Sequence, residues 1–192
     1  MYSPSIERAL RAAVDARDRQ VRAGLVPESR SVHPFHVAMM LARWGLEEDV
    51  IVAGLMSGVA SNGYGWESER LVDEFGSHVA ALVGELAGAE TDAAQRVEHV
   101  ARLSPSAAAI QAATELHRLQ NLLAELREAD NPAAVWASTE EGCAGTLAHS
   151  GRLVEALAAR VEPKLARALN AAQRALVEHV ERTGPTGIVR AS

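Results

Sequence analysis

The chain has 192 residues, a formal net charge of −6 and a pI near 5.7, and 48% of its residues are hydrophobic although only 4% are aromatic. This length suits one domain with a sizeable core, and the richness in Ala and Leu predicts an all-α fold. The acidic balance and a single lysine, Lys164, argue against nucleic acid as a partner, because a phosphate backbone requires clustered basic side chains.

The N-terminal segment 3–27 is predicted to be an amphipathic helix that ends at Gly24 and Pro27. Its expected buried stripe consists of Ile6, Leu10, Ala13 and Val14. The segment lacks the apolar centre of a signal peptide, and no stretch approaches the roughly 20 apolar residues of a membrane span. Cys143 is the only cysteine, which excludes an internal disulfide. We expect a cytoplasmic protein without a membrane partner.

The stretch 33–62 is predicted to form two packed helices. Pro34 favours a helix start, apolar residues follow at helical spacing, and Gly45 is suited to a left-handed helix end. Acidic side chains at 47–49 then favour the start of a second helix, because they lie at its positive end. That second helix is expected to continue through Leu55 and Met56.

The rest of the chain is predicted to be helical as well, which gives about eight to ten helices in all. Ser104 is suited to cap a long helix with Pro105 in its first turn, and Pro163 favours the start of the last helix. The leucines of the long helix that are expected to pack into the core are Leu116, Leu119, Leu123 and Leu126. The tail 185–192 lacks helical periodicity and is expected to be flexible. The predicted domain therefore covers residues 1–184.

Two stretches carry a resemblance to a known family. Residues 33–62 match in spacing the pattern HPxxVAxxLxxxGxDxxxxxAxLLHDxxED, and ELHRLQNL at 115–122 overlays LADRLHNL. Both patterns belong to the HD superfamily of metal-dependent phosphohydrolases, and the chain most resembles its small ppGpp-hydrolase branch. The resemblance spans about residues 6–180 and implies a single-domain HD-type helical fold.

The resemblance also implies that most of the family's metal ligands are absent. His33 falls on the first metal-binding histidine, and His117 falls on the last metal-binding aspartate. The family's His-Asp pair falls on Ser and Gly at 57–58, and its Glu-Asp pair on Ser and Asn at 61–62. A residual metal site would have only His33 and His117, and these suit manganese poorly because that ion prefers oxygen ligands. We therefore predict neither a metal nor a cofactor.

The phosphate-binding side of the family's pocket is altered too. Family lysines fall on Gln111 and Thr114, whereas Arg22 matches an arginine that lines the family's nucleotide pocket. A pocket with small polar residues at the former metal site should be roomy and nearly neutral. The predicted ligand-binding residues are Arg22, Ser57, Ser61, Asn62, His117 and Asn121. The predicted apolar walls are Val37, Leu55 and Leu116.

These observations favour a catalytically degenerate protein, a pseudoenzyme, that binds a small ligand or a protein partner and does not hydrolyse ppGpp. Two alternatives stay open. In the first, His33 and His117 are catalytic and perform metal-independent acid-base chemistry on a small organic substrate, because imidazole titrates near neutral pH. In the second, a residual metal site hydrolyses a nucleotide.

Overall fold

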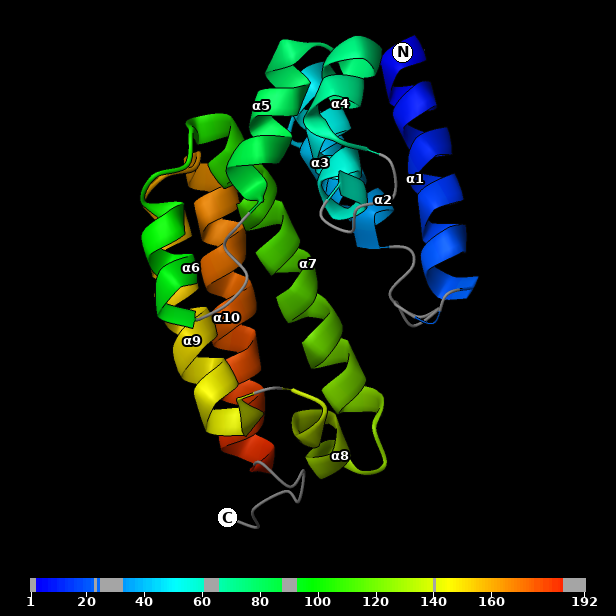
Figure 1. Ribbon diagram of the computed structural model, residues 1–192. Coiled ribbons are helices and arrows are strands. Elements are labelled where there is room, and N and C mark those ends of the chain that lie inside the picture. The colour runs from blue at the N-terminus through cyan, green and yellow to red at the C-terminus, as the bar shows by residue number, and fades with distance from the viewer. Residues whose placement is uncertain are drawn as a thin grey trace.

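The computed structural model describes residues 3–22, 24, 33–60, 66–87, 93–139 and 141–184, which contain ten helices and no strand (Figure 1). The all-α prediction is confirmed, and the predicted tail 185–192 lies outside the described residues. The helices are α1 (Pro4–Arg22), α2 (His33–Arg43), α3 (Glu48–Ala60), α4 (Ser68–Phe75), α5 (Ser77–Leu86), α6 (Ala93–Val100), α7 (Pro105–Glu128), α8 (Pro132–Ala137), α9 (Gly142–Ala158) and α10 (Pro163–Thr183). None of them is long and apolar enough to cross a bilayer.

Local sequence chemistry sets several helix ends as predicted. The Ser104 hydroxyl accepts a hydrogen bond from the Ala107 amide at 3.2 Å, and Pro105 occupies the first turn of α7. Gly45 after α2 has a φ of +75°, and Gly76 between α4 and α5 has a φ of +91°. Residues with a Cβ rarely adopt these angles. The turns therefore depend on glycine, and they fix where the helices around the site begin and end.

Helix α7 is the central element of the fold. Figure 1 shows α1–α5 around one end of α7, with α6, α9 and α10 along its other side. Helix α3 packs against α1, α2 and α5, and α7 packs against α2, α3, α5, α9 and α10. The leucines of α7 that are predicted to face the core are buried, namely Leu116, Leu119, Leu123 and Leu126. The helices on both sides of α7 thus bury apolar surface around this one helix.

The predicted buried stripe of α1 is wrong in part. Leu10 and Val14 are 37% and 46% exposed, while the fully buried face of α1 consists of alanines, Ala9, Ala13 and Ala16. These small side chains let α1 approach α3, its packing partner, closely. Helical spacing alone predicts an amphipathic helix, but only the partner helix determines which face becomes buried.

Candidate functional site

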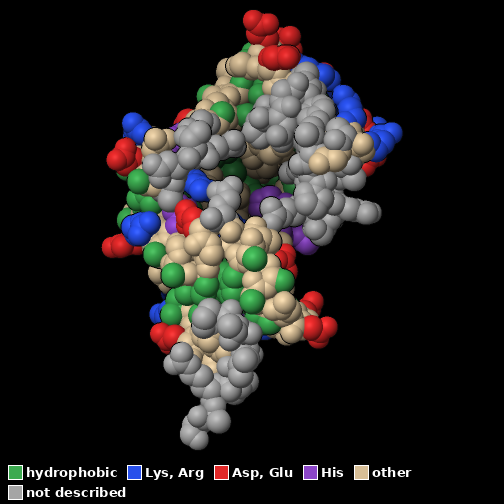
Figure 2. Space-filling view, turned by 60° about the horizontal axis from the view of Figure 1, so that its bottom comes forward, with side chains coloured by type: hydrophobic (Ala, Val, Ile, Leu, Met, Phe, Trp, Pro, Cys, Tyr) green, Lys and Arg blue, Asp and Glu red, His purple; other side chains and the backbone are tan. Residues whose placement is uncertain are grey.

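A pocket of about 700 Å³ opens among helices α2 to α7. Apolar side chains supply most of its walls, among them Val37, Leu71, Val83, Leu86 and Ile110. Polar side chains enter from α2, α3 and α7, namely His33, Ser57, Gln111 and Thr114. Figure 2 shows a hollow near the middle of one face of the molecule, with histidine and Lys/Arg side chains at its edge. The volume and the mixed lining are typical of a small-molecule site.

Three histidine rings meet where α2 faces α7. His33 and His36 lie about one helical turn apart on α2, and both contact His117 on α7. The Nδ1 atoms of His33 and His117 are 2.7 Å apart, and His117 Nε2 is 2.9 Å from His36 Nδ1. His117 is buried, whereas His36 is exposed and His33 lines the pocket. The three rings form a hydrogen-bonded path between the pocket and the surface of α2.

The protons on these rings are coupled, because each hydrogen bond needs one donor and one acceptor. When His117 donates to His36 from Nε2, its neutral ring accepts at Nδ1 from His33, and the opposite tautomer reverses both bonds. The pKa of His117 lies below the usual 6.5, first because burial disfavours its charged form and second because His36 is close. His117 is therefore uncharged at neutral pH, and the three rings can relay a proton.

The structure brings several of the predicted site residues together. His33 contacts His117, and Ser57 and Gly58 line the same pocket as His33. The Ser57 hydroxyl donates a hydrogen bond to the Gly54 carbonyl of its own helix at 3.1 Å. The Ser57 hydroxyl therefore donates its proton to the backbone, whereas an activated serine would donate its proton to a base. Ser57 serves as a small polar part of the pocket wall.

Other predicted site residues lie elsewhere. Arg22 at the end of α1 is exposed, and its Nε donates to the Asp18 carbonyl at 3.1 Å. Asn121 Nδ2 is 3.4 and 3.5 Å from the two ring nitrogens of His117, so it lies against the ring face and not in its plane. Arg22, Asn121 and His117 are not among the residues that line the pocket, so His117 reaches it only through His33. The predicted contacts at 61–62 fall outside the described residues.

Of the three predicted apolar walls, one lines the pocket. Val37 faces the pocket, whereas Leu55 and Leu116 are buried in the core behind it, at 0% and 2% exposure. Trp66 also lines the pocket, with the Arg70 guanidinium 3.9 Å from its ring centroid. The indole therefore belongs to the pocket wall and makes a cation–π contact with Arg70.

The described donor set does not fit the divalent metal of an HD phosphohydrolase. No group of three or more His, Cys, Asp or Glu side chains in the described ranges is arranged to hold a metal ion. Both nitrogens of His117 are engaged by His33 and His36, and the helix α3 residues at the family's His-Asp positions offer Ser57 and Gly58 in place of ligands.

Sequence reasoning missed two residues of the site. His36 follows His33 by three positions, a spacing that places both rings on one face of a helix, so the signal was present. Arg96 lines the pocket from α6, and its Nε is buried without a hydrogen-bond partner. No motif marks Arg96, because only the fold brings α6 to the pocket.

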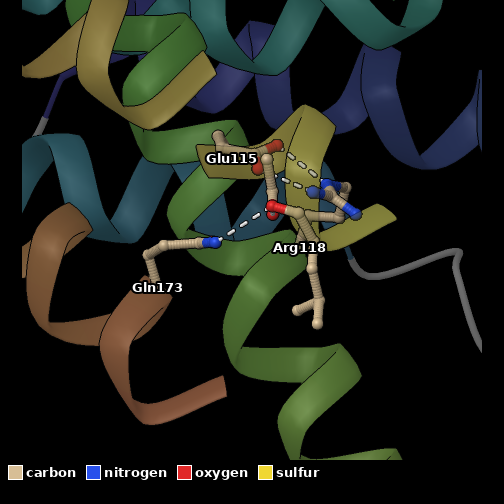
Figure 3. Close-up of polar contacts among 5 residues, drawn as sticks. Glu115, Arg118 and Gln173 are labelled. Atoms are coloured by element: carbon tan, nitrogen blue, oxygen red, sulfur yellow. Dashed lines mark hydrogen bonds and ion pairs between the residues drawn. The ribbon is translucent and has the colours of Figure 1, made fainter. Parts of the chain in front are cut away.

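A second polar cluster lies between α7, α9 and α10 (Figure 3). Glu115, which is 3% exposed, accepts two hydrogen bonds from Arg118, at 2.8 and 2.7 Å. Gln173 on α10 donates from Nε2 to the Leu147 carbonyl on α9 at 3.3 Å. The bidentate pair keeps the buried carboxylate of Glu115 compensated.

The three buried histidines are His117, His149 and His179. Burial is the main cause that lowers the pKa of each of them below 6.5. For His149 the next cause is repulsion from Arg96, and for His179 it is repulsion from Arg182. All three are therefore neutral in the folded protein at neutral pH.

The only lysine of the chain is remote from these sites. Lys164 is exposed in the first turn of α10 and lines a separate pocket of about 160 Å³ with Trp44 and Leu165. It does not line the larger pocket. Any anion in the larger pocket must therefore be held without a lysine.

The fold and the site together define an all-α protein with a pocket between two helix groups and a histidine cluster at its edge. A family model described as HD domain matches residues 9–139. Because this match covers more than half of the chain, the protein belongs to the HD-domain family, and the resemblance seen in the sequence is confirmed.

Several solved structures are similar to this chain, among them the following two. One, with a TM-score of 0.71 and 19% sequence identity, is of a metazoan ortholog of SpoT that hydrolyses ppGpp and plays a role in starvation responses; the alignment covers 91% of this chain and 96% of that one. The other is lmo0812 from Listeria monocytogenes EGD-e, with a TM-score of 0.63 and 22% identity over 75% of this chain and 96% of that one. These similarities show the fold. No curated protein matches the sequence.

Proposed function

We propose that this HD-domain protein binds a small organic ligand in the pocket of about 700 Å³ and does not carry out metal-dependent phosphohydrolysis. The observation that carries the proposal is the pocket itself, in which Ser57 and Gly58 line the wall at positions where the family places its His-Asp pair. Replacement of metal-binding His and Asp side chains by small neutral residues leaves room for an organic molecule and removes the groups that would hold a metal to activate water.

A small ligand explains this pocket better than a protein partner does. The pocket is concave and largely apolar, with a few converging polar groups, which is the usual form of a small-molecule site. By contrast, the exposed large apolar side chains of the described residues are few and spread over α1, α2 and α4, namely Leu10, Val14, Met39 and Val72. A protein-binding face would be expected to gather such side chains in one larger patch.

Metal-independent catalysis is the second candidate function, and the histidine cluster favours it. His33 lines the pocket and contacts the neutral ring of His117 at 2.7 Å, so a substrate proton taken up at His33 could pass to His117. In that case His117→Gln would abolish turnover but leave ligand binding intact. If the protein only binds its ligand, the wild type shows no turnover, and His117→Gln has none to lose.

The main test blocks the pocket. Gly84 on α5 lines the pocket, and a Cβ placed there would meet no atom within 4 Å, so Gly84→Phe can project a ring into the cavity without a backbone clash. The matched control is His78→Phe near the start of the same helix, because His78 is exposed and does not line the pocket. Ligand-observed NMR with a fragment library should give hits for the wild type and His78→Phe that Gly84→Phe loses. Equal hits for all three proteins would contradict the proposal.

The same preparations test the absence of phosphohydrolysis. With ppGpp and manganese, the wild-type protein is expected to release no pyrophosphate above background, because its described residues offer no carboxylates arranged to hold the ion. Robust pyrophosphate release that His33→Ala abolishes would overturn this part of the proposal and establish a residual metal site.

A further inference from the structure

Arg96 is the cation of the pocket that the rest of the described structure leaves uncompensated. It projects from α6 into the pocket lining, and its Nε is buried without a hydrogen-bond partner. No ion pair of Arg96 occurs in the described part of the chain. Because burial removes water from a charged donor, an unpaired guanidinium N–H in such a place is unfavourable until an acceptor arrives.

Two carboxylates of neighbouring helices are bound to other groups. Glu115 accepts both hydrogen bonds of the Arg118 fork, and Glu85 accepts a hydrogen bond from the Ser104 amide at 2.7 Å. Arg96 lies near His149, because repulsion from Arg96 is, after burial, a cause of the lowered pKa of His149. Arg96 thus has a neutral histidine as a neighbour and lines the pocket.

The remaining lining limits how much negative charge a ligand can carry. Glu67 also lines the pocket, so the fixed charges of the described lining are one guanidinium and one carboxylate. Lys164 lines the other pocket. A polyphosphate would bring several negative charges to a single cation, whereas one carboxylate would match the planar fork of one arginine.

We propose that the pocket binds a small organic carboxylate, with its anionic head on Arg96 and its apolar body against the Val37, Val83 and Ile110 walls. This inference rests on the proposed function, that the pocket holds a small ligand, and it names the class of that ligand. A volume of about 700 Å³ accommodates an aryl or branched aliphatic acid with space to spare.

Calorimetric titration with matched probes tests this assignment. The probes are 4-phenylbutyrate, its uncharged counterpart 4-phenylbutyramide, and inorganic pyrophosphate as a compact polyanion. The wild type is expected to bind the carboxylate at least about tenfold more tightly than the amide or pyrophosphate, because a hydrogen bond to a charged partner is stronger than a neutral one. Arg96→Gln should remove that preference and leave the weaker binding of the amide unchanged, which also shows that the variant folds.

Arg102→Gln is the matched control, because Arg102 is exposed in the turn that follows α6 and does not line the pocket. It should keep the wild-type preference. The assignment is overturned if the amide binds as tightly as the carboxylate, if pyrophosphate binds most tightly, or if Arg96→Gln keeps the preference. In each of these cases the pocket still holds a ligand. If no probe binds and Gly84→Phe changes no binding in the fragment screen, the proposed function itself fails.

Discussion

Gly54 on α3 lies against side chains of α2, and Gly54→Ala tests that packing. A Cβ at this position would lie 2.7 Å from Leu41 Cδ1, 3.7 Å from Val37 Cγ1 and 3.9 Å from Ile110 Cγ2. The first distance is well below van der Waals contact. Leu41 is fully buried, and a methyl group in a close-packed core moves only at a cost in free energy.

Two effects of opposite sign decide the outcome. Replacement of a mid-helix glycine by alanine normally stabilises a helix by about 0.5–1 kcal/mol, because alanine loses less backbone entropy on folding. Overpacking of a close-packed core costs about 1–3 kcal/mol. The clash with Leu41 should prevail, and Gly54→Ala should lower the free energy of unfolding by about 1 kcal/mol and the melting temperature by about 2–4 °C.

Urea unfolding followed by circular dichroism measures the difference. Gly151→Ala in the middle of α9 is the matched control, because a Cβ there meets only Gln173 Nε2, at an ordinary 3.7 Å. This control should gain about 0.5–1 kcal/mol. In the double variant with Leu41→Ala the new methyl group fills part of the cavity, so the double variant should lose less stability than the sum of the two single losses. A Gly54→Ala protein as stable as Gly151→Ala would refute the close approach.

Three further outcomes are expected. Glu115→Gln should lower the free energy of unfolding by about 1–2 kcal/mol, because it leaves the half-exposed Arg118 fork without its carboxylate; Arg11→Gln, at an exposed ion pair, should change it by less than about 0.5 kcal/mol in the same urea titration. The three buried histidines resist protonation in the folded state, so the unfolded state binds more protons below about pH 6.5. The free energy of unfolding should therefore be highest above about pH 6.5 and decrease as the pH falls below it; equal values at about pH 7.5 and 5.5 would contradict this. Ser104→Ala should cost about 1 kcal/mol through loss of the α7 cap, measured by thermal unfolding, and an unchanged melting temperature would show that the cap is dispensable.

Local chemistry made much of the fold predictable. The cap at Ser104, the positive φ of Gly45 and the buried leucines of α7 each follow from residue types at fixed short spacings, and the structure confirms them. The buried face of α1 did not follow in this way. Leu10 and Val14 fit the helical period as well as the alanines do. Which face of α1 becomes buried depends on its packing against α3, and the spacing of residues within α1 carries no information about that partner.

The site was predictable only where a motif placed it. The overlay of two stretches brought His33 and His117 together correctly, although they are 84 residues apart in the chain. The overlay gave no information on Arg96, because only the folded position of α6 places this side chain in the pocket lining. Arg22 illustrates the reverse case, because it matches the family by sequence, yet its side chain is exposed and bonded to the Asp18 carbonyl.

Lys164 gives the protein one side chain through which it can be attached to a surface or a label. As the only lysine, exposed in the first turn of α10, it is the only side chain that amine-reactive reagents can modify. It lines the smaller pocket beside Trp44 and not the larger one. A dye, a biotin or a sensor surface coupled through this ε-amine would therefore leave the lining of the larger pocket chemically unaltered, whereas in most proteins the many surface lysines give a mixture of orientations.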